Sequence, residues 1–187
     1  YGIAIARIEM LNKDQMDLVI KYSKLKNYEI LPTLFFEFHG SEDSNKESIK
    51  IVEEISKNNK GSDFKWAKTL EDRNKLWKAR HDCYYSVKAQ GSNFKVYSTD
   101  VCVPISNLAE CINFTEEEIK KLGLKAPMVG HVGDGNFHAI IGYDPNKNGE
   151  YEKIRTLSNK LIDKTLELEG TITGEHGIGL HKKAYLL

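Results

Sequence analysis

Two glycine-rich stretches contain most of the residues in this sequence that could perform chemistry. The first is GHVGDGNFH, in which His131 and His138 flank a turn, and the second is TGEHGIG, in which Glu175 and His176 lie between glycines. Glycine has no Cβ, so its backbone can approach a ligand closely. Imidazole and carboxylate groups bind divalent metals and transfer protons. The two stretches therefore indicate a metal site, an acid–base site, or both.

The first stretch predicts a hairpin that brings the two histidines together. Asp134-Gly135 is typical of a two-residue type I′ turn between strands. Counting outward from this turn places His131 directly opposite His138, on one face, with Cβ atoms about 4.5–5.5 Å apart. Two imidazoles in that position could bind one metal ion. The alternative is a solvent-exposed hairpin whose histidines bind no metal and are merely compatible with the turn.

The second stretch supplies a third candidate ligand. His131, His138 and Glu175 form the His₂Glu set of an open catalytic metal site, which leaves a position for water or substrate. A structural site more often has four protein ligands, commonly cysteines, but all three cysteines lie outside both stretches: Cys83, Cys102 and Cys111. This ligand set suits zinc and is compatible with manganese.

His176 is adjacent to Glu175 and would point in a different direction, so it could be a free base near the metal. The alternative is a loop histidine that is hydrogen-bonded to backbone. Two other site types stay open on these residues alone. Glu175 could be the general base of a metal-dependent hydrolase, or the site could be a non-catalytic metal-binding module.

Composition limits the class of protein. The chain has 187 residues, 40% hydrophobic and 29% charged, which is typical of a globular domain. Lys plus Arg and Asp plus Glu both number 27, and this balance argues against a nucleic-acid partner. The cysteines include no CxxC pair and are expected to be reduced. The most apolar stretch, residues 31–38, is too short to span a bilayer.

Both ends of the sequence suggest a piece of a longer protein. The first residues, YGIAIARIEM, have no initiator methionine and no signal or transit pattern. The last residues, HKKAYLL, stop within a predicted helix. Any targeting segment is therefore expected to lie outside these residues.

Hydrophobic periodicity predicts a single α+β domain over residues 1–187. Strands are predicted at residues 3–10, 33–39, 64–67, 97–103, 128–131 and 137–143. Helices are predicted after the capping boxes Asn12/Gln15 and Ser44/Glu47, at residues 70–89 and 107–122, and from Asn148 to Gly170. The strand–helix alternation up to residue 67 is typical of a ferredoxin-like split βαβ unit. We expect a mostly antiparallel sheet with helices on one side.

The two glycine-rich stretches, with other segments, resemble the C-terminal, substrate-capping domain of FAD-linked oxidases. The similarity is strongest to the mitochondrial branch that oxidises D-lactate, and it extends from Ala6 to Lys183. The other segments that carry it are YSTDVCVPIS, FEFHG, DFKWAK and LWKARH, which begin at Tyr97, Phe36, Asp63 and Leu76.

The resemblance implies a role for each candidate residue. His131, His138 and Glu175 match the metal ligands of the family, and His176 matches its catalytic base. Two more residues match substrate contacts: Arg80, which would hold a carboxylate, and Asn136. Without the resemblance, Arg80 would be interpreted as a helix-surface arginine that pairs with Asp72 or Asp82.

The resemblance also implies an activity. The full enzyme would carry an N-terminal FAD-binding domain and a C-terminal tail, both absent here, and would oxidise D-lactate or a similar small D-2-hydroxy acid to the 2-oxo acid. It would be mitochondrial, with cytochrome c as electron acceptor, and this chain alone would be inactive. D-2-hydroxyglutarate and glycolate are the alternative substrates. The hydroxyglutarate branch has a lysine where Ser98 aligns, so the uncharged Ser98 indicates a monocarboxylate.

Overall fold

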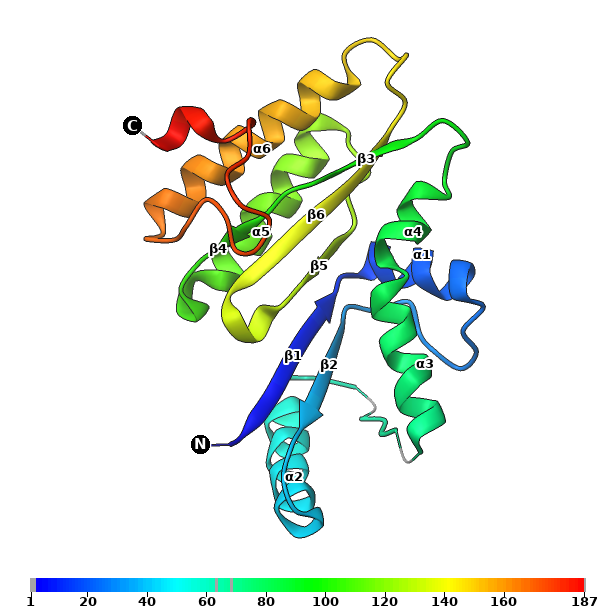
Figure 1. Ribbon diagram of the computed structural model, residues 1–187. Coiled ribbons are helices and arrows are strands. Elements are labelled where there is room, and N and C mark those ends of the chain that lie inside the picture. Colours follow the sequence, from blue (N-terminus) through cyan, green and yellow to red (C-terminus); the bar gives the residue numbers. More distant parts are fainter. Residues whose placement is uncertain (1–2, 63, 68, 187) are drawn as a thin grey trace.

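The computed structural model describes residues 3–62, 64–67 and 69–186, and it shows helices packed around a central sheet (Figure 1). The strand order is β2-β1-β5-β6-β3, and β4 also pairs with β6. All of these pairs are antiparallel, which confirms an α+β fold with a mostly antiparallel sheet. The strands are β1 (Ile5–Leu11), β2 (Thr33–Phe38), β3 (Lys95–Ser98), β4 (Val101–Cys102), β5 (Met128–Gly130) and β6 (Asn136–Tyr143).

The helices begin and end near the predicted signals. Asn12 caps the first helix by accepting a hydrogen bond from the Gln15 amide at 3.0 Å, as predicted. The second helix begins one turn earlier than predicted, because Ser41 and not Ser44 is its N-cap. The helices are α1 (Lys13–Ser23), α2 (Glu42–Asn58), α3 (Leu70–His81), α4 (Cys83–Lys88), α5 (Ile105–Leu122) and α6 (Glu150–Glu167), with 3₁₀ turns η1 (Val132–Asp134) and η2 (Lys183–Leu186).

Two predicted elements differ from the structure. The helix predicted at residues 70–89 is divided at Asp82 into α3 and α4, although backbone hydrogen bonds run across the division. Residues 64–67 were expected to form a strand but pair with no strand among the described residues. The aromatic rings of Phe64 and Trp66 pack against each other there, at 5.7 Å between centroids. Asp63 and Lys68, which end the DFKWAK segment, lie outside the described residues.

The split βαβ unit is present, but in the second half of the chain instead of the first. β1 and β2 are direct antiparallel neighbours, so they do not form such a unit. β4 and β5 instead flank β6, and α5 connects them. After α6 the chain returns beside β4 through an antiparallel bridge between Cys102 and Thr171. This order matches a ferredoxin-like unit whose last strand is reduced to one bridge.

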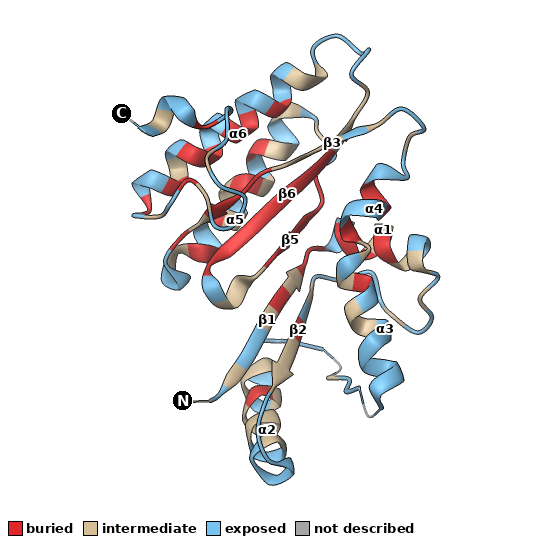
Figure 2. Ribbon diagram, in the orientation of Figure 1, coloured by how far each residue is buried: buried red, intermediate tan, exposed pale blue. Residues whose placement is uncertain are grey.

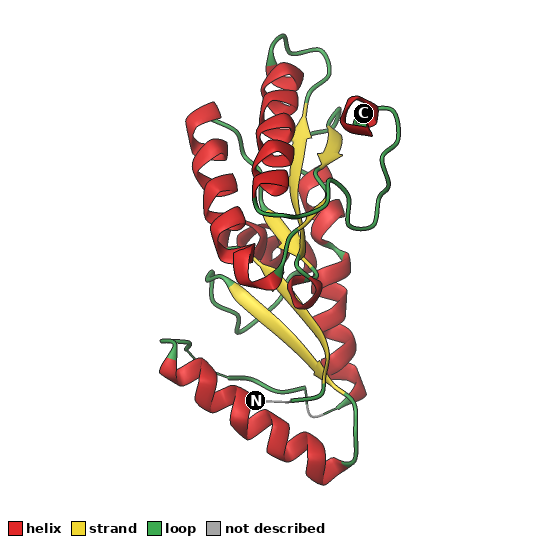
Figure 3. Ribbon diagram, turned by 90° about the vertical axis from the view of Figure 1, so that its left-hand side faces the viewer, coloured by secondary structure: helices red, strands yellow, loops and turns green. Residues whose placement is uncertain are grey.

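Helices cover both faces of the sheet, which corrects the expectation of helices on one side (Figure 3). One core packs α5 and α6 against residues such as Phe137, Ala139 and Ile141 of β6. The other core packs α1, α3 and α4 against Leu11, Val129 and Ile140. β6 is therefore buried along most of its length (Figure 2). None of the helices in the described ranges has the length and apolarity needed to cross a membrane.

Candidate metal and acid–base centre

The turn between β5 and β6 is a 3₁₀ turn, and the predicted two-residue hairpin is wrong. β5 pairs with β6 through Val129 opposite His138. Continuing this register places His131 opposite Asn136, whose amide donates to the His131 carbonyl at 3.3 Å. The pairing thus differs from the predicted one by two residues, an even number. Because side chains alternate between the faces of a strand, both histidines still share a face.

The two imidazoles are close on that face. Their ring centroids lie 6.4 Å apart, and the rings are perpendicular. His138 is buried among neighbours of the sheet, whereas the side chain of His131 is 34% exposed. The predicted proximity of the two histidines is therefore found as a diagonal contact and not as a directly opposed pair.

His131 is oriented by Glu9, a buried residue of β1. β1 pairs with β5 through Met10 opposite Gly130, and one further step along this register places Glu9 opposite His131. The Nδ1 atom of His131 lies 2.6 Å from Oε1 of Glu9, so Nδ1 donates and Nε2 is left facing the site. The hydrogen bond to Glu9 raises the pKa of His131. A carboxylate behind a histidine in this way is common at metal centres.

His138 is oriented by the backbone. Its Nδ1 donates to the carbonyl oxygen of Thr99 at 2.8 Å, so its Nε2 carries the lone pair. Burial lowers the pKa of His138, which favours the neutral form of the ring. That Nε2 atom is buried without a hydrogen-bond partner, although Oε1 of Glu175 lies 2.9 Å away. A neutral Nε2 and a carboxylate oxygen are both acceptors, so this contact needs a cation or a proton between them.

Glu175 completes a convergent set of acceptors. Its Oε1 faces His138, and its Oε2 lies 3.5 Å from Nε2 of His131. These ligand atoms all lie within 4.8 Å of one another. Zinc–ligand distances of about 2.0–2.1 Å imply ligand–ligand separations of roughly 3.3 Å in a tetrahedron, close to the 2.9 and 3.5 Å from the Glu175 oxygens to the two histidines. The three predicted ligands therefore fit a divalent cation, with both histidines already presenting lone pairs.

A second group of possible ligands, formed by Asp100, His138 and His176, fits a cation less well. The oxygens of Asp100 are already occupied by donors. Oδ1 accepts from the Asn136 amide at 2.9 Å, and Oδ2 accepts from the hydroxyl of Thr173 at 2.6 Å and from three backbone amides. Asp100 therefore holds protein groups, and we assign it no metal.

Asp100 instead anchors the GEHG loop. The three backbone amides that donate to its Oδ2 belong to Gly174, Glu175 and His176, at 2.9–3.1 Å. Burial alone would raise the pKa of Asp100, but the hydrogen bonds from Thr173 and these amides hold it well below its usual range. The register of β3 and β4 against β6 places Asp100 opposite His138. Asp100 thus fixes the GEHG loop, which carries Glu175, beside His138.

Lys182 reinforces this anchor from the far side of the loop. Its side chain is buried, and its Nζ donates to the Asp100 carbonyl at 2.6 Å and to the Ile172 carbonyl. Burial lowers the pKa of this lysine. The two ends of the GEHG loop are therefore tied to the same strand segment.

His176 lies at the open side of the site. Its ring stacks on that of His138, with centroids 4.8 Å apart and planes 17° apart. Its side chain is 47% exposed, and its Nε2 lies 3.6 Å from Oε1 of Glu175. It is therefore next to the three ligands but free to contact a bound molecule, as a base would have to be.

Arg80 reaches the site from α3. Its Nε donates to Oε2 of Glu9 at 2.9 Å, and its Nη2 lies 3.4 Å from Nε2 of His131. Asp72 and Asp82, the partners expected of a surface arginine, have other contacts.

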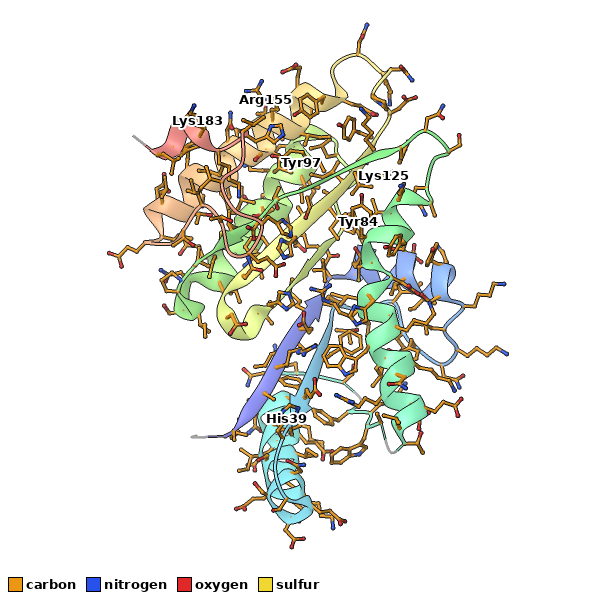
Figure 4. The ribbon with its side chains drawn as sticks, in the orientation of Figure 1. His39, Tyr84, Tyr97, Lys125, Arg155 and Lys183 are labelled. Carbon is orange, nitrogen blue, oxygen red and sulfur yellow. The ribbon has the colours of Figure 1, made fainter. Side chains whose placement is uncertain are left out.

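His39, one of the six histidines in the sequence, contrasts with the three candidate histidines. It lies beside α2, at the opposite end of the molecule from α6 (Figure 4).

Asn136 is buried beneath the GEHG loop. Its Nδ2 donates to Oδ1 of Asp100 and to the carbonyl of Val101, which leaves its Oδ1 buried and unpartnered. A Cβ on Gly174 would lie 2.0 Å from Asn136 Nδ2, so only glycine allows this approach. All six candidate residues therefore lie in one region.

The candidate set from the sequence did not include Glu9, Asp100 and Lys182. An acidic residue inside the mostly apolar strand IARIEML, which also contains Arg7, was the one signal for Glu9. Asp100 and Lys182 had no comparable signal, because the sequence does not show that residues 100 and 173–176 are adjacent.

Comparison with known proteins identifies the relatives of this domain. The family described as "FAD linked oxidases, C-terminal domain" matches residues 1–187. A zebrafish (Danio rerio) protein described as "Probable D-lactate dehydrogenase, mitochondrial" is 46% identical over 99% of this chain and 37% of its own length. An Arabidopsis thaliana protein, "D-lactate dehydrogenase [cytochrome], mitochondrial", is 37% identical over 99% of this chain and 32% of its own.

A solved structure supports the fold. The 4-ethylphenol oxidase of Gulosibacter chungangensis aligns with a TM-score of 0.60 over 89% of this chain and 38% of the oxidase, at 13% sequence identity. At that identity the likeness concerns the fold alone. This chain spans roughly a third of the length of each relative named here.

Proposed function

Because the chain belongs to the FAD-linked oxidases, as their C-terminal domain, we propose that the full-length protein oxidises D-lactate or a similar small D-2-hydroxy acid to the 2-oxo acid. The observation that carries the proposal is the convergence of Nε2 of His131, Nε2 of His138 and the Glu175 carboxylate, with His176 and Arg80 beside them. These groups could serve the oxidation of a hydroxy acid, because they supply a cation site, a base and an arginine that can bind the substrate carboxylate.

His131, His138 and Glu175 would hold a divalent metal, zinc or manganese. When bound there, such a metal is a Lewis acid that lowers the pKa of a coordinated hydroxyl. When bound by the rest of the protein, FAD supplies hydride acceptance. This chain's own residues bind and orient the substrate and remove its proton.

Arg80 would bind the substrate carboxylate. Its guanidinium is held at Nε by Glu9, and its Nη atoms remain as donors toward the site. A planar guanidinium matches the geometry of a carboxylate better than a lysine does. The substrate hydroxyl would then face the exposed edge of His176, which would accept the hydroxyl proton at Nε2. Asn136 would lie beside the substrate.

A monocarboxylate is the proposed substrate class. Ser98, at the end of β3, is half-buried, and its Oγ donates to the carbonyl of Thr99 at 3.2 Å. It therefore offers no charge to a second carboxylate. Glycolate, which is also a monocarboxylate, and D-2-hydroxyglutarate are the alternative substrates, and comparing kcat/KM for these three acids would decide among them.

We propose a mitochondrial location and cytochrome c as the electron acceptor. The support is the words "mitochondrial" and "[cytochrome]" in the names of the relatives described above. Subcellular fractionation and reduction of cytochrome c by the purified protein with D-lactate would test both. This chain without FAD is expected to have no turnover.

The central test is His176→Ala in the full-length protein. Loss of a general base should slow flavin reduction by D-lactate by about 10²–10⁴-fold in rapid-reaction measurements, with flavin content unchanged. The control is His39→Ala, because His39 is exposed, lies beside α2 (Figure 4) and belongs to neither group of possible ligands. Flavin reduction at the wild-type rate in His176→Ala would contradict the assignment of the base.

A further inference from the structure

We propose that Glu9 is a positioning residue that fixes the metal ligand His131 and the substrate-binding Arg80 relative to each other. The inference rests on the proposed function, since it concerns the same site. It assigns a role to a residue of β1 that touches neither metal nor substrate. A displacement of His131 or of Arg80 would then alter the position of the other through the Glu9 carboxylate.

The geometry is that of a two-sided bridge. Oε1 of Glu9 lies 2.6 Å from Nδ1 of His131, and Oε2 accepts from Nε of Arg80 at 2.9 Å. The two oxygens of one carboxylate thus have one donor each. The donors are His131, which directly follows β5, and Arg80 of α3, and they are 51 residues apart in the sequence.

Burial makes this bridge rigid. The side chain of Glu9 is 1% exposed, and that of Arg80 is 17% exposed. A buried carboxylate is tolerated only when its charge is paired and its oxygens are hydrogen-bonded. Both conditions are met by His131 and Arg80 together, so Glu9 cannot swing away from either one without a large cost.

The charge of Glu9 acts on both partners. At His131, a carboxylate behind Nδ1 fixes the tautomer that presents the Nε2 lone pair and raises the basicity of the ring as a ligand. At Arg80, the salt bridge uses Nε and turns the Nη atoms toward the site, where Nη2 lies 3.4 Å from Nε2 of His131 and the remaining Nη hydrogens could donate to a substrate. The same side chain therefore prepares the cation site and the carboxylate site.

The decisive variant is Glu9→Gln in the full-length flavoprotein. Glutamine has one acceptor and one donor, so it can satisfy His131 or Arg80 but presents its NH₂ to the other. We expect the dissociation constants for Zn²⁺ and Mn²⁺, measured by chelator competition on metal-depleted protein, to rise about 10–100-fold. The KM for D-lactate at saturating metal should rise about tenfold or more.

Glu37→Gln is a matched control. Glu37 lies on the neighbouring strand β2 and also bridges an arginine and a histidine, Arg73 and His39, with a side chain that is 10% exposed. Its recorded partners, Arg7, Arg73 and His39, are not candidate site residues, so its loss should leave both metal affinity and KM unchanged. If Glu9 had a purely structural role, Glu9→Gln would lower the thermal stability of the protein. The metal dissociation constants and the KM of the folded variant would then be unchanged.

Glu9→Asp keeps the charge and shortens the side chain by one methylene, which tests the proposal if Glu9→Gln does not fold. Both constants should worsen by a smaller factor than in Glu9→Gln. Wild-type values for metal affinity and KM in every folded Glu9 variant would overturn the inference while leaving the proposed function intact. A wild-type protein that binds neither metal and whose flavin D-lactate does not reduce would overturn the proposed function, and the inference with it.

Discussion

Nε2 of His138 and Oε1 of Glu175 lie 2.9 Å apart, although burial lowers the pKa of His138 and so favours the neutral ring. Two acceptors at hydrogen-bond distance form a stable contact only around a shared cation or proton. The geometry of the loop and the strand is thus compatible with a shared cation at this contact. His131 does not take part in this contact, because its Nε2 faces the other oxygen of the same carboxylate, Oε2 of Glu175.

His138→Ala should therefore lose the metal. Removal of one of three protein ligands leaves two, and elemental analysis of the full-length protein should show a fall from about one metal per chain to well below that value. His181→Ala is the control, because His181 lies beside Tyr97, outside the ligand group. Full metal content in His138→Ala would remove this residue from the set of ligands.

Arg80→Lys should weaken substrate binding more than turnover. Lysine keeps the positive charge but cannot contact Glu9 and a substrate carboxylate as a planar fork. Hydrogen bonds to charged groups contribute about 1.5–3 kcal/mol, so KM for D-lactate should rise roughly 10–100-fold. Steady-state kinetics provide the measurement, with Arg73→Lys as the control at the Glu37 pair, which includes no candidate site residue. An unchanged KM would argue that Arg80 is purely structural.

Asp100→Asn should make stability less dependent on acid pH. The folded-state pKa of Asp100 is depressed, so its contribution to stability is present above its unfolded pKa of about 3.9 and is lost as pH falls through the folded value. Denaturant unfolding of the full-length protein should show a deficit of about 3 kcal/mol in the variant at pH 7, which shrinks below about pH 4. The control, Asp17→Asn, removes an exposed pair with Lys21 and should change little. A deficit that is constant with pH would show that the charge of Asp100 is not responsible.

Gly174→Ala should displace the GEHG loop. The added methyl would lie 2.0 Å from Nδ2 of Asn136 and 3.1 Å from Oδ1 of Asp100, and neither buried group can move freely. We expect weaker metal binding in chelator competition and faster exchange of the backbone amides at residues 174–176. Gly133→Ala, where the methyl would make ordinary contact with Ile8 at 3.4 Å, is the comparison. Equal exchange and affinity in the two variants would mean that the loop tolerates the methyl.

The sequence predicted most of the elements and most of the site for local reasons. Strand composition, the cap at Asn12 and the glycines at helix ends are determined by residues within a few positions of one another. The candidate ligands could be named from the sequence because GHVGDGNFH and GEHG are short and carry their chemistry locally, and their role as ligands stays a prediction. The helix predicted across Asp82 was nearly right for the same reason.

The errors concern relationships between distant residues. The turn at residues 132–135 does not depend on Asp134-Gly135 alone. It also packs against Val103, whose carbonyl oxygen would lie 2.0 Å from a Cβ on Gly135. Glu9 and His131 are 122 residues apart, and Asp100 and the GEHG loop are more than 70 apart. Nothing in a local pattern specifies which buried carboxylate meets which loop.

The even shift in the β5–β6 register has a consequence for how this domain can vary in length. A single residue inserted into or deleted from the turn would rotate one histidine to the opposite face of the sheet, into the core beneath α5 and α6. A change of two residues would keep both imidazoles on the site face and alter only their offset. Natural length variants of this turn are therefore expected to differ by pairs of residues wherever the proposed metal site is retained.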